Sequence, residues 1–230
     1  MHAIAFRLLA AVALGAWLNV AAAAELDKIS NQDAVRGLKA ALEKGSTVAV
    51  NNLGRSDGFF GNDKVKIPLP DSLKRYERLM RGVGMGKYAD ELILTMNRAA
   101  EAAVPEAKVL LVDAVKKMSV QDAKGVLTGG DTAGTEYFKR TTSDPLRAKF
   151  LPIVQQSTKK VKLAESYNNY AGQAAKFGLV SKEQANLDAY VTQKALDGLF
   201  YMVGEEEKKI RRDPVGAGSD ILKKVFGALK

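Results

Sequence analysis

The chain has 230 residues, a formal net charge of +9 at pH 7 and no cysteine, with a single histidine, His2, and a single tryptophan, Trp17. Beyond residue 24 it therefore offers no histidine, cysteine or tryptophan. Hydrolysis by a Ser-His-Asp triad, cysteine nucleophiles, histidine general bases and His/Cys zinc sites need these residue types, so these chemistries are excluded there.

The first 24 residues follow the order of a secretory signal peptide. Met1–Arg7 carries one positive charge, an apolar run begins at Leu8, and a run of alanines ends at Ala24 before the polar sequence ELDK. We expect export to the periplasm with cleavage after Ala24. A membrane anchor is the alternative, but the apolar core is short of the roughly 20 residues that a spanning helix needs. No later stretch is long and apolar enough to span a bilayer, so we expect residues 25–230 to form one domain that does not span the membrane.

Basic residues outnumber acidic ones, 35 Lys and Arg against 26 Asp and Glu. Loss of Arg7 with the signal peptide leaves 34 against 26, a net charge of +8. Two stretches, Gly61–Asp90 and Asp131–Tyr170, each carry an excess of +3. Such surfaces attract anionic lipid headgroups, acidic polysaccharide or nucleic acid, although they also serve solubility alone. Because the sequence holds no nucleic-acid motif, we expect no nucleic-acid partner.

Apolar residues recur at helical spacing through nearly the whole chain beyond residue 30. We expect helices, in chain order, over 31–53, 72–83, 87–103, 106–118, 120–130, 133–140, 146–160, 161–177, 187–212 and 219–229. Period-two alternation is not sustained anywhere. The sequence therefore predicts an all-α fold, a single-domain bundle of roughly eight to ten helices.

Residues 55–70, RSDGFFGNDKVKIPLP, are the longest irregular stretch. Two glycines and two prolines oppose helix there. Phe59, Phe60, Ile67 and Leu69 are too apolar for a solvated linker, so we expect a loop that is pinned onto the core.

Several residues mark where helices should begin or bend. Ser119 with Asp122 resembles a capping box, and Ser181 or Asn186 is a candidate start for the helix over 187–212. Ser-Asp-Pro ending at Pro145 predicts a new helix start, and Pro152 should kink or restart that helix.

The stretch LTGGDTAGTEYFKR, residues 127–140, nearly spells a phosphate-binding loop, because Gly129 and Gly134 are followed by Thr135. Such a loop needs a preceding strand and a lysine at the position of Thr135, and both are missing. The sequence instead predicts a left-handed glycine stop for one helix and a cap for the next at Asp131 or Thr132.

Two other clusters read as structural. GVGMGK, residues 82–87, follows an amphipathic helix and predicts a tight helix–helix corner. EEE at 205–207 precedes KKIRR, so Glu205–Lys209 and Glu207–Arg211 pairs predict a solvated helix face whose charges compensate one another. The acidic clusters lack the oxygen ladder of a calcium loop, and we expect no metal site.

AESYNNYAGQ, residues 164–173, contains a Glu-Ser pair of the kind that lytic transglycosylases use, with Glu165 as the candidate general acid. The glycine-rich pattern of those enzymes is missing, and no tryptophan beyond residue 24 stacks on a sugar. A surface position is the alternative interpretation.

Polar residues interrupt the alanine-rich stretch 87–103. Asn97, Arg98 and Glu101 either form a buried structural set, with an Arg98–Glu101 ion pair, or line a ligand pocket. Lys66 in the irregular stretch and Arg140 after the glycines are further basic candidates for ligand binding.

DGFFGNDKVKIPLP, ADELILTMNRAAEAAVPEAK, LTGGDTAGTEYFKR and EEEKKIRRDPVGAGSDILKKVFG together resemble a family of exported proteins of Gram-negative bacteria, the domain-of-unknown-function family 4197. The resemblance covers nearly all of the chain beyond the signal peptide. It implies a helical, exported, single-domain protein, and it implies no activity, cofactor or site residue.

These observations favour a non-enzymatic periplasmic protein with a basic surface that binds a partner, either an anionic envelope component or another envelope protein. Two alternatives stay open. One is a carboxylate-based hydrolase or lyase of cell-wall glycan acting through Glu165, and the other is a small-molecule carrier lined by Asn97, Arg98 and Glu101. The sequence indicates no cofactor.

Overall fold

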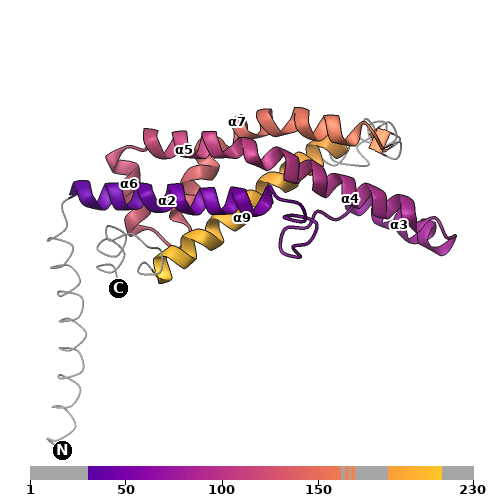
Figure 1. Cartoon of the computed structure of the whole chain (residues 1–230), viewed down its shortest axis with the longest axis horizontal. Coiled ribbons are helices and arrows are strands. Elements are labelled where there is room, and N and C mark those ends of the chain that lie inside the picture. Colours follow the sequence, from indigo (N-terminus) through magenta and orange to yellow (C-terminus); the bar gives the residue numbers. More distant parts are fainter. Residues whose placement is uncertain (1–30, 162–163, 166, 169–185, 214–230) are drawn as a thin grey trace, which may run out of the picture.

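The computed structural model describes residues 31–161, 164–165, 167–168 and 186–213. Within them the chain is mostly helical and forms no strand, which confirms the all-α prediction there (Figure 1). The elements are α2 (Asn31–Leu53), α3 (Asp71–Gly82), α4 (Gly86–Ala103), the 3₁₀ helix η1 (Val104–Glu106), α5 (Ala107–Lys117), α6 (Val120–Thr128), α7 (Ala133–Thr158) and α9 (Leu187–Arg212). The described residues thus hold seven α-helices, fewer than the eight to ten expected. The helices expected over 161–177 and 219–229 lie largely or wholly outside them.

The helix α9 occupies the middle of the packing, in contact with α7, α2 and α4. Its inward residues, among them Val191, Ala195 and Leu199, are fully buried. Figure 1 shows α2 and α9 crossing at an angle. The surface between α7 and α9 is the most extensive contact of the described residues, and it carries the candidate site described below.

The helix α7 runs unbroken from Ala133 to Thr158 through Pro145 and Pro152, so the predicted separate helices over 133–140 and 146–160 are wrong. Both prolines are exposed, while Phe138 and Phe150 of the same helix are fully buried. A proline removes one backbone hydrogen bond, but on a solvent-facing side the freed carbonyl stays hydrated. Core packing of the buried face therefore outweighs the local helix-breaking signal.

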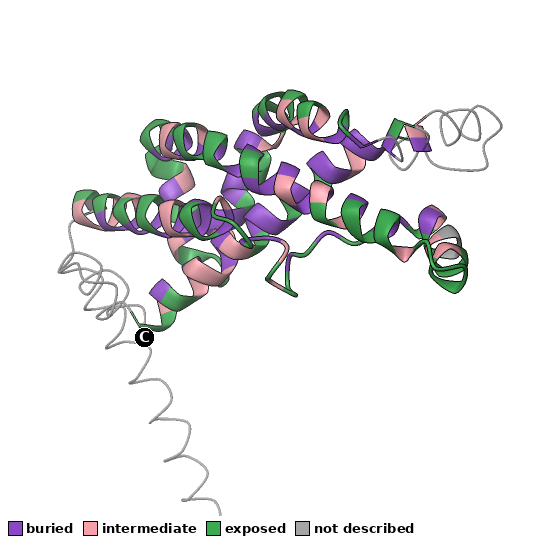
Figure 2. Cartoon of the chain, turned by 45° about the vertical axis from the view of Figure 1, so that its right-hand side comes forward, coloured by how far each residue is buried: buried purple, intermediate pink, exposed green. Residues whose placement is uncertain are grey.

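The helices α3 and α4 form a hairpin that projects from the bundle, joined at Val83–Met85 (Figure 1). Gly84 has φ of 76°, a left-handed conformation that glycine adopts without strain. The predicted helix–helix corner at 82–87 is confirmed. Figure 2 shows that the end of this hairpin is exposed.

The irregular stretch after α2 lies against the bundle, as predicted. Phe59, Ile67 and Leu69 are buried, and a Cβ on Gly198 of α9 would lie 2.6 Å from Phe59 Cε1. Gly198 therefore lets the phenylalanine ring reach the α9 backbone. Burial of a phenylalanine side chain contributes about 1.5–3 kcal/mol toward holding the loop in place.

Two predicted helix starts are confirmed. Ser119 and Asp122 form a complete capping box at α6, and the Asn186 side chain accepts the backbone N–H of Ala189 at the start of α9. Along the described part of the chain, no helix is both long enough and apolar enough to cross a bilayer.

Candidate functional site

Asn97 of α4 is fully buried and holds the loop after α2 through the backbone of Ile67. Its Oδ1 accepts the Ile67 N–H at 2.8 Å, and its Nδ2 donates to the Ile67 carbonyl at 2.9 Å. Nδ2 also donates to the Ile93 carbonyl at 2.8 Å. The amide is therefore committed to bonds within the chain.

Glu101 lies one turn further along α4 and is also buried. Its Oε1 accepts the backbone N–H groups of Phe59 (3.0 Å) and Phe60 (3.1 Å), and its Oε2 accepts from Arg98 Nη1 at 2.6 Å. Arg98 also donates to Asp57 at 2.8 Å. Its hydrogen bond to Glu101, with that to Asp57, raises the pKa of Arg98. The Arg98–Glu101 ion pair is present as predicted, but only the Glu101 side of it is buried, since the Arg98 side chain is 39% exposed.

Lys66 joins this cluster from the loop side. Its Nζ lies 4.2 Å from the centroid of the Phe60 ring, and the Arg98 guanidinium lies 5.9 Å from the same centroid. The structure thus brings together four of the predicted ligand residues, Lys66, Asn97, Arg98 and Glu101, but the polar atoms of α4 bind the loop. A neighbouring hollow of about 520 Å³ is lined instead by the outer side of the loop, including Arg55, Asp63 and Lys64.

The other two predicted residues lie elsewhere. Arg140 of α7 donates to Asp122 at 3.2 Å and lies 5.6 Å from the Tyr137 ring centroid, so it ties α7 to the capping box of α6. Hydrogen bonding from Ser119, followed by the charge of Arg140, holds the pKa of Asp122 below its usual value. Glu165 has an exposed side chain.

The stretch 127–140, which resembles a phosphate-binding loop, is bound by a residue from another helix. Glu207 of α9 accepts the backbone N–H groups of Gly134 (2.9 Å) and Thr135 (2.8 Å) at the first turn of α7. Thr132 occupies the cap position as predicted, but its side chain makes no capping bond. The predicted left-handed stop at Gly129 or Gly130 is wrong, because Gly129 has φ of −82° and, among the described glycines, only Gly84 has a positive φ.

Glu207 is buried, which corrects the prediction of a solvated face at 205–207. It does pair with Arg211, as predicted, at 2.9 Å. A Cβ on Gly134 would lie 3.0 Å from Glu207 Oε1 and 2.4 Å from Leu42 Cδ2. The glycine is required because the carboxylate and the α2 side chain approach the α7 backbone this closely.

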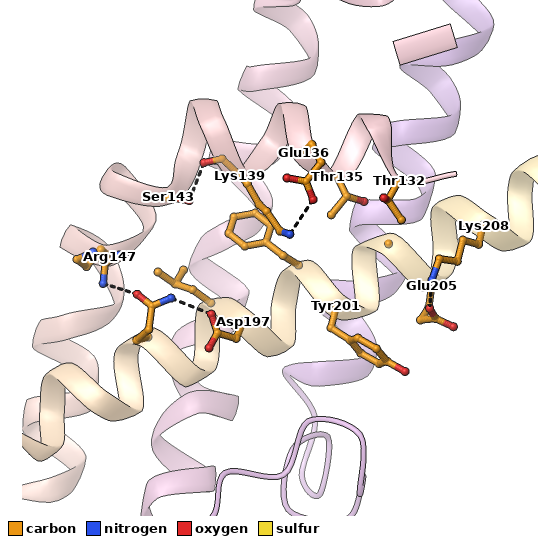
Figure 3. Close-up of a pocket in the computed structure, with 14 residues that line it drawn as sticks. Thr132, Thr135, Glu136, Lys139, Ser143, Arg147, Asp197, Tyr201, Glu205 and Lys208 are labelled. Carbon is orange, nitrogen blue, oxygen red and sulfur yellow. Dashed lines mark hydrogen bonds and ion pairs between the residues drawn. The ribbon is translucent and has the colours of Figure 1, made fainter. Parts of the chain in front are cut away.

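A groove of about 500 Å³ opens between α7 and α9, outside this buried cap (Figure 3). Leu196 and Phe200 of α9, both buried, form its apolar floor. Polar side chains line its walls, from Thr132, Thr135, Glu136, Lys139, Ser143 and Arg147 on α7 and from Gln193, Asp197, Tyr201, Glu205 and Lys208 on α9. It lies within the range of volumes, roughly 300–1,000 Å³, that ligand sites occupy.

The two walls differ in sign. The α7 wall contributes Lys139, Arg147 and one acid, whereas the α9 wall contributes Asp197, Glu205 and one base. Lys139 pairs with Glu136 of its own helix at 2.8 Å. One polar chain crosses the groove, from Arg147 to Gln193 Oε1 (2.7 Å) and from Gln193 Nε2 to Asp197 (2.8 Å).

At the far end of the α9 wall, Lys208 binds Glu205 at 2.8 Å. The hydrogen bond from Lys208 holds the pKa of Glu205 below its usual value, so this carboxylate stays charged. Lys139 and Glu205 thus pair within their own helices, whereas Arg147 bonds to Gln193 on the opposite wall (Figure 3).

Two hydroxyls of the groove lining are bound within the chain. The Ser143 hydroxyl donates to the Lys139 carbonyl at 2.6 Å, and the Thr135 hydroxyl donates to Glu207 at 2.8 Å, so both hydroxyls are engaged. Among the described residues no group of three or more acidic, histidine or cysteine side chains is placed to hold a metal.

Sequence reasoning missed this groove. The α7 residues Glu136, Lys139, Ser143 and Arg147 recur at helical spacing, as do Gln193, Asp197, Tyr201 and Glu205 on α9. That spacing shows which residues share a face. It does not show that these two faces meet, because their meeting depends on the antiparallel packing of helices distant in sequence.

No curated protein and no solved structure matches the chain. The family described as "Protein of unknown function (DUF4197)" matches residues 28–227, nearly the whole chain beyond its first residues. The chain belongs to this family.

Proposed function

We propose that the protein is a non-enzymatic, periplasmic, envelope-associated binding protein that holds an extended peptide segment of a partner in the α7–α9 groove. The observation that carries the proposal is the pair of oppositely charged walls above an apolar floor. Lys139 and Arg147 face acidic groups of a ligand, and Asp197 and Glu205 face basic ones.

An extended peptide fits such a site for three reasons. Its backbone offers both donors and acceptors to the polar walls, its side chains carry charges of either sign, and an apolar side chain fits over Leu196 and Phe200. A purely anionic ligand would meet the acids of the α9 wall without compensation, which costs affinity.

The periplasmic part of the proposal rests on the N-terminal sequence, where a basic start, an apolar core and the alanines ending at Ala24 precede the helical region. Cell fractionation and N-terminal sequencing test it. A cytoplasmic protein that retains Met1–Ala24 would contradict it.

Selection of a random-sequence peptide library on the purified protein tests the groove. We expect enriched peptides that combine an acidic residue, a basic residue and an apolar one. The double variant Lys139→Glu/Arg147→Glu should weaken binding of these peptides by about tenfold or more, because charge-assisted bonds become repulsions.

The matched control is Lys108→Glu/Lys149→Glu, which changes the net charge equally at two exposed positions outside the groove lining. This variant should bind the selected peptides as the wild type does. Peptides that bind both double variants equally, or a selection without enrichment, would overturn the proposal.

The alternatives raised by the sequence gain nothing from this geometry. The polar atoms of Asn97 and Glu101 bind the loop, and Arg98 pairs with Glu101 and Asp57. Glu165 is exposed, and its neighbour Ser166 lies outside the described residues.

A further inference from the structure

The end of the α3–α4 hairpin, Arg78–Tyr88, gathers exposed apolar side chains, and we call it the hairpin tip. Leu79 is 61%, Val83 72%, Met85 46% and Tyr88 43% exposed. The remaining large exposed apolar residues in the described chain, Leu94, Val109, Val120 and Tyr201, are spread over four helices. Contiguous exposed apolar surface marks an interaction site far more often than scattered residues do.

The charges of the tip are all positive. Residues 78–88, RLMRGVGMGKY, contain Arg78, Arg81 and Lys87 and no acid, and all three cations are exposed. The acidic residues nearest to the tip lie behind it, toward the body, at Asp71, Glu77, Asp90 and Glu91.

Three of those acids are held by cations. Arg81 binds Glu77 on its own helix at 2.9 Å and Asp90 on α4 at 2.5 Å, so it braces the two arms of the hairpin. Asp71 pairs with Lys74 at 2.7 Å. Arg78 and Lys87 extend the positive charge forward, beside the apolar side chains.

The shape of the tip is convex. A Cβ added to Gly82 or to Gly84 would meet no neighbouring atom within 4 Å, so the turn faces open space. The helix α3 packs on α4 and stands away from the bundle (Figures 1 and 2). The tip thus protrudes, has an apolar end, and carries a tyrosine and positively charged side chains beside that end. Such a surface is complementary to a planar membrane interface with anionic headgroups.

We propose that the hairpin tip docks the protein on the surface of an anionic lipid bilayer. Val83, Met85 and Leu79 enter the boundary between headgroups and acyl chains, Tyr88 lies at headgroup level, and Arg78 and Lys87 bind lipid phosphates. This placement rests on the envelope location in the proposed function and is independent of peptide binding in the groove.

Binding to vesicles tests the docking. The purified protein should co-sediment with vesicles of phosphatidylethanolamine and phosphatidylglycerol and should bind vesicles of phosphatidylcholine at least about tenfold more weakly. Val83→Ser/Met85→Ser and Arg78→Glu/Lys87→Glu should each weaken binding to the anionic vesicles by about tenfold or more.

Matched controls separate the tip from general properties of the surface. Val109→Ser/Val120→Ser removes apolar side chains that are 67% and 57% exposed on other helices. Lys108→Glu/Lys149→Glu makes the same change in net charge away from the tip. Neither control alters the chain termini. Both should bind anionic vesicles within about twofold of the wild type.

A site-specific probe reports entry into the lipid. Because the chain has no cysteine, Val83→Cys and Val109→Cys each carry a single polarity-sensitive fluorophore. Emission from position 83 should shift to shorter wavelength on anionic vesicles, and emission from position 109 should not.

Tip variants that bind vesicles like the wild type would overturn the proposal. An equal loss of vesicle binding in Lys108→Glu/Lys149→Glu would also overturn it, as would an emission wavelength at position 83 that does not change on vesicles. Tip variants that change only self-association, or only binding to a protein, would assign the tip to a protein interface instead. Lys139→Glu/Arg147→Glu should retain vesicle binding, so failure of the groove and failure of the tip are distinguishable.

Discussion

Thr135 and Glu207 lie 72 residues apart, yet Glu207 Oε2 accepts both the backbone N–H and the hydroxyl of Thr135, each at 2.8 Å. The N-terminus of a helix carries unpaired N–H groups and a partial positive charge, which makes it an anion site. In this protein the site at the start of α7 is filled by a carboxylate of the chain itself. Residues 127–140 therefore do form an anion-binding helix start, as a phosphate loop does, but the anion that they bind is the Glu207 carboxylate of the same chain.

Replacing Glu207 by glutamine should destabilise the protein by about 2–4 kcal/mol, because the amide keeps one acceptor oxygen and turns an NH₂ group toward buried donors and Arg211. Urea unfolding followed by circular dichroism measures the change. The control Glu43→Gln, at an exposed position of α2, should stay within about 0.5 kcal/mol of the wild type. A Glu207→Gln protein as stable as that control would show that the carboxylate does not hold α7.

Gly134→Ala should cost about 1–3 kcal/mol, because the added Cβ would lie 2.4 Å from Leu42 Cδ2 and 3.0 Å from Glu207 Oε1. Gly125→Ala is the matched control within α6, where an added Cβ meets nothing within 4 Å. That change should stabilise by about 0.5–1 kcal/mol, since alanine favours helix. Thermal unfolding compares the two, and equal effects would mean that the contact at Gly134 relaxes freely.

Local chemistry predicted much of the helical structure. The capping box at Ser119, the cap at Asn186 and the corner at 82–87 depend on neighbouring residues alone, and all three are confirmed. The unbroken α7 was not predictable in this way. Its continuity through Pro145 depends on burial of Phe138 and Phe150 against distant helices.

The same limit explains why the polar residues of α4 could be singled out from the sequence whereas the groove could not. The side chains of Asn97 and Glu101 were recognised as unusual because polar residues interrupt an alanine-rich helix, and they are indeed buried. Their partners, backbone groups of the loop, carry no signal in the sequence. The groove depends on the packing of α7 on α9, so its residues looked like ordinary surface positions.

Asn97→Ala should release the loop over residues 55–70 more than it weakens the bundle. The buried N–H and C=O of Ile67 lose their partners, at a cost of about 2–4 kcal/mol. Amide hydrogen exchange should speed up across the loop while α7 and α9 keep their protection. Asn52→Ala, at an exposed asparagine just before the loop, is the control and should leave exchange unchanged. Uniformly faster exchange in all helices would contradict a local role.

Tyr190 should make the protein sensitive to alkaline pH. Burial, with a smaller effect of the nearby Asp71 carboxylate, raises the pKa of Tyr190 to about 12, and its hydroxyl donates to the Pro68 carbonyl at 3.0 Å. Because the folded pKa lies above the unfolded value of about 10, the unfolded state loses its proton first. The contribution is complete below about pH 10 and is lost as the pH rises toward 12.

The free energy of unfolding of the wild type should therefore decrease between about pH 10 and 12. In Tyr190→Phe this decrease should be smaller by about 1–2 kcal/mol, a range that allows for partial exposure of the ring. Burial also raises the pKa of Tyr137, so some alkaline loss remains in this variant. Urea unfolding at a series of pH values measures the effect, with Tyr201→Phe, at an exposed tyrosine of α9, as the control. If both variants follow the wild-type curve, the Tyr190–Pro68 hydrogen bond does not contribute to the coupling between the loop and α9.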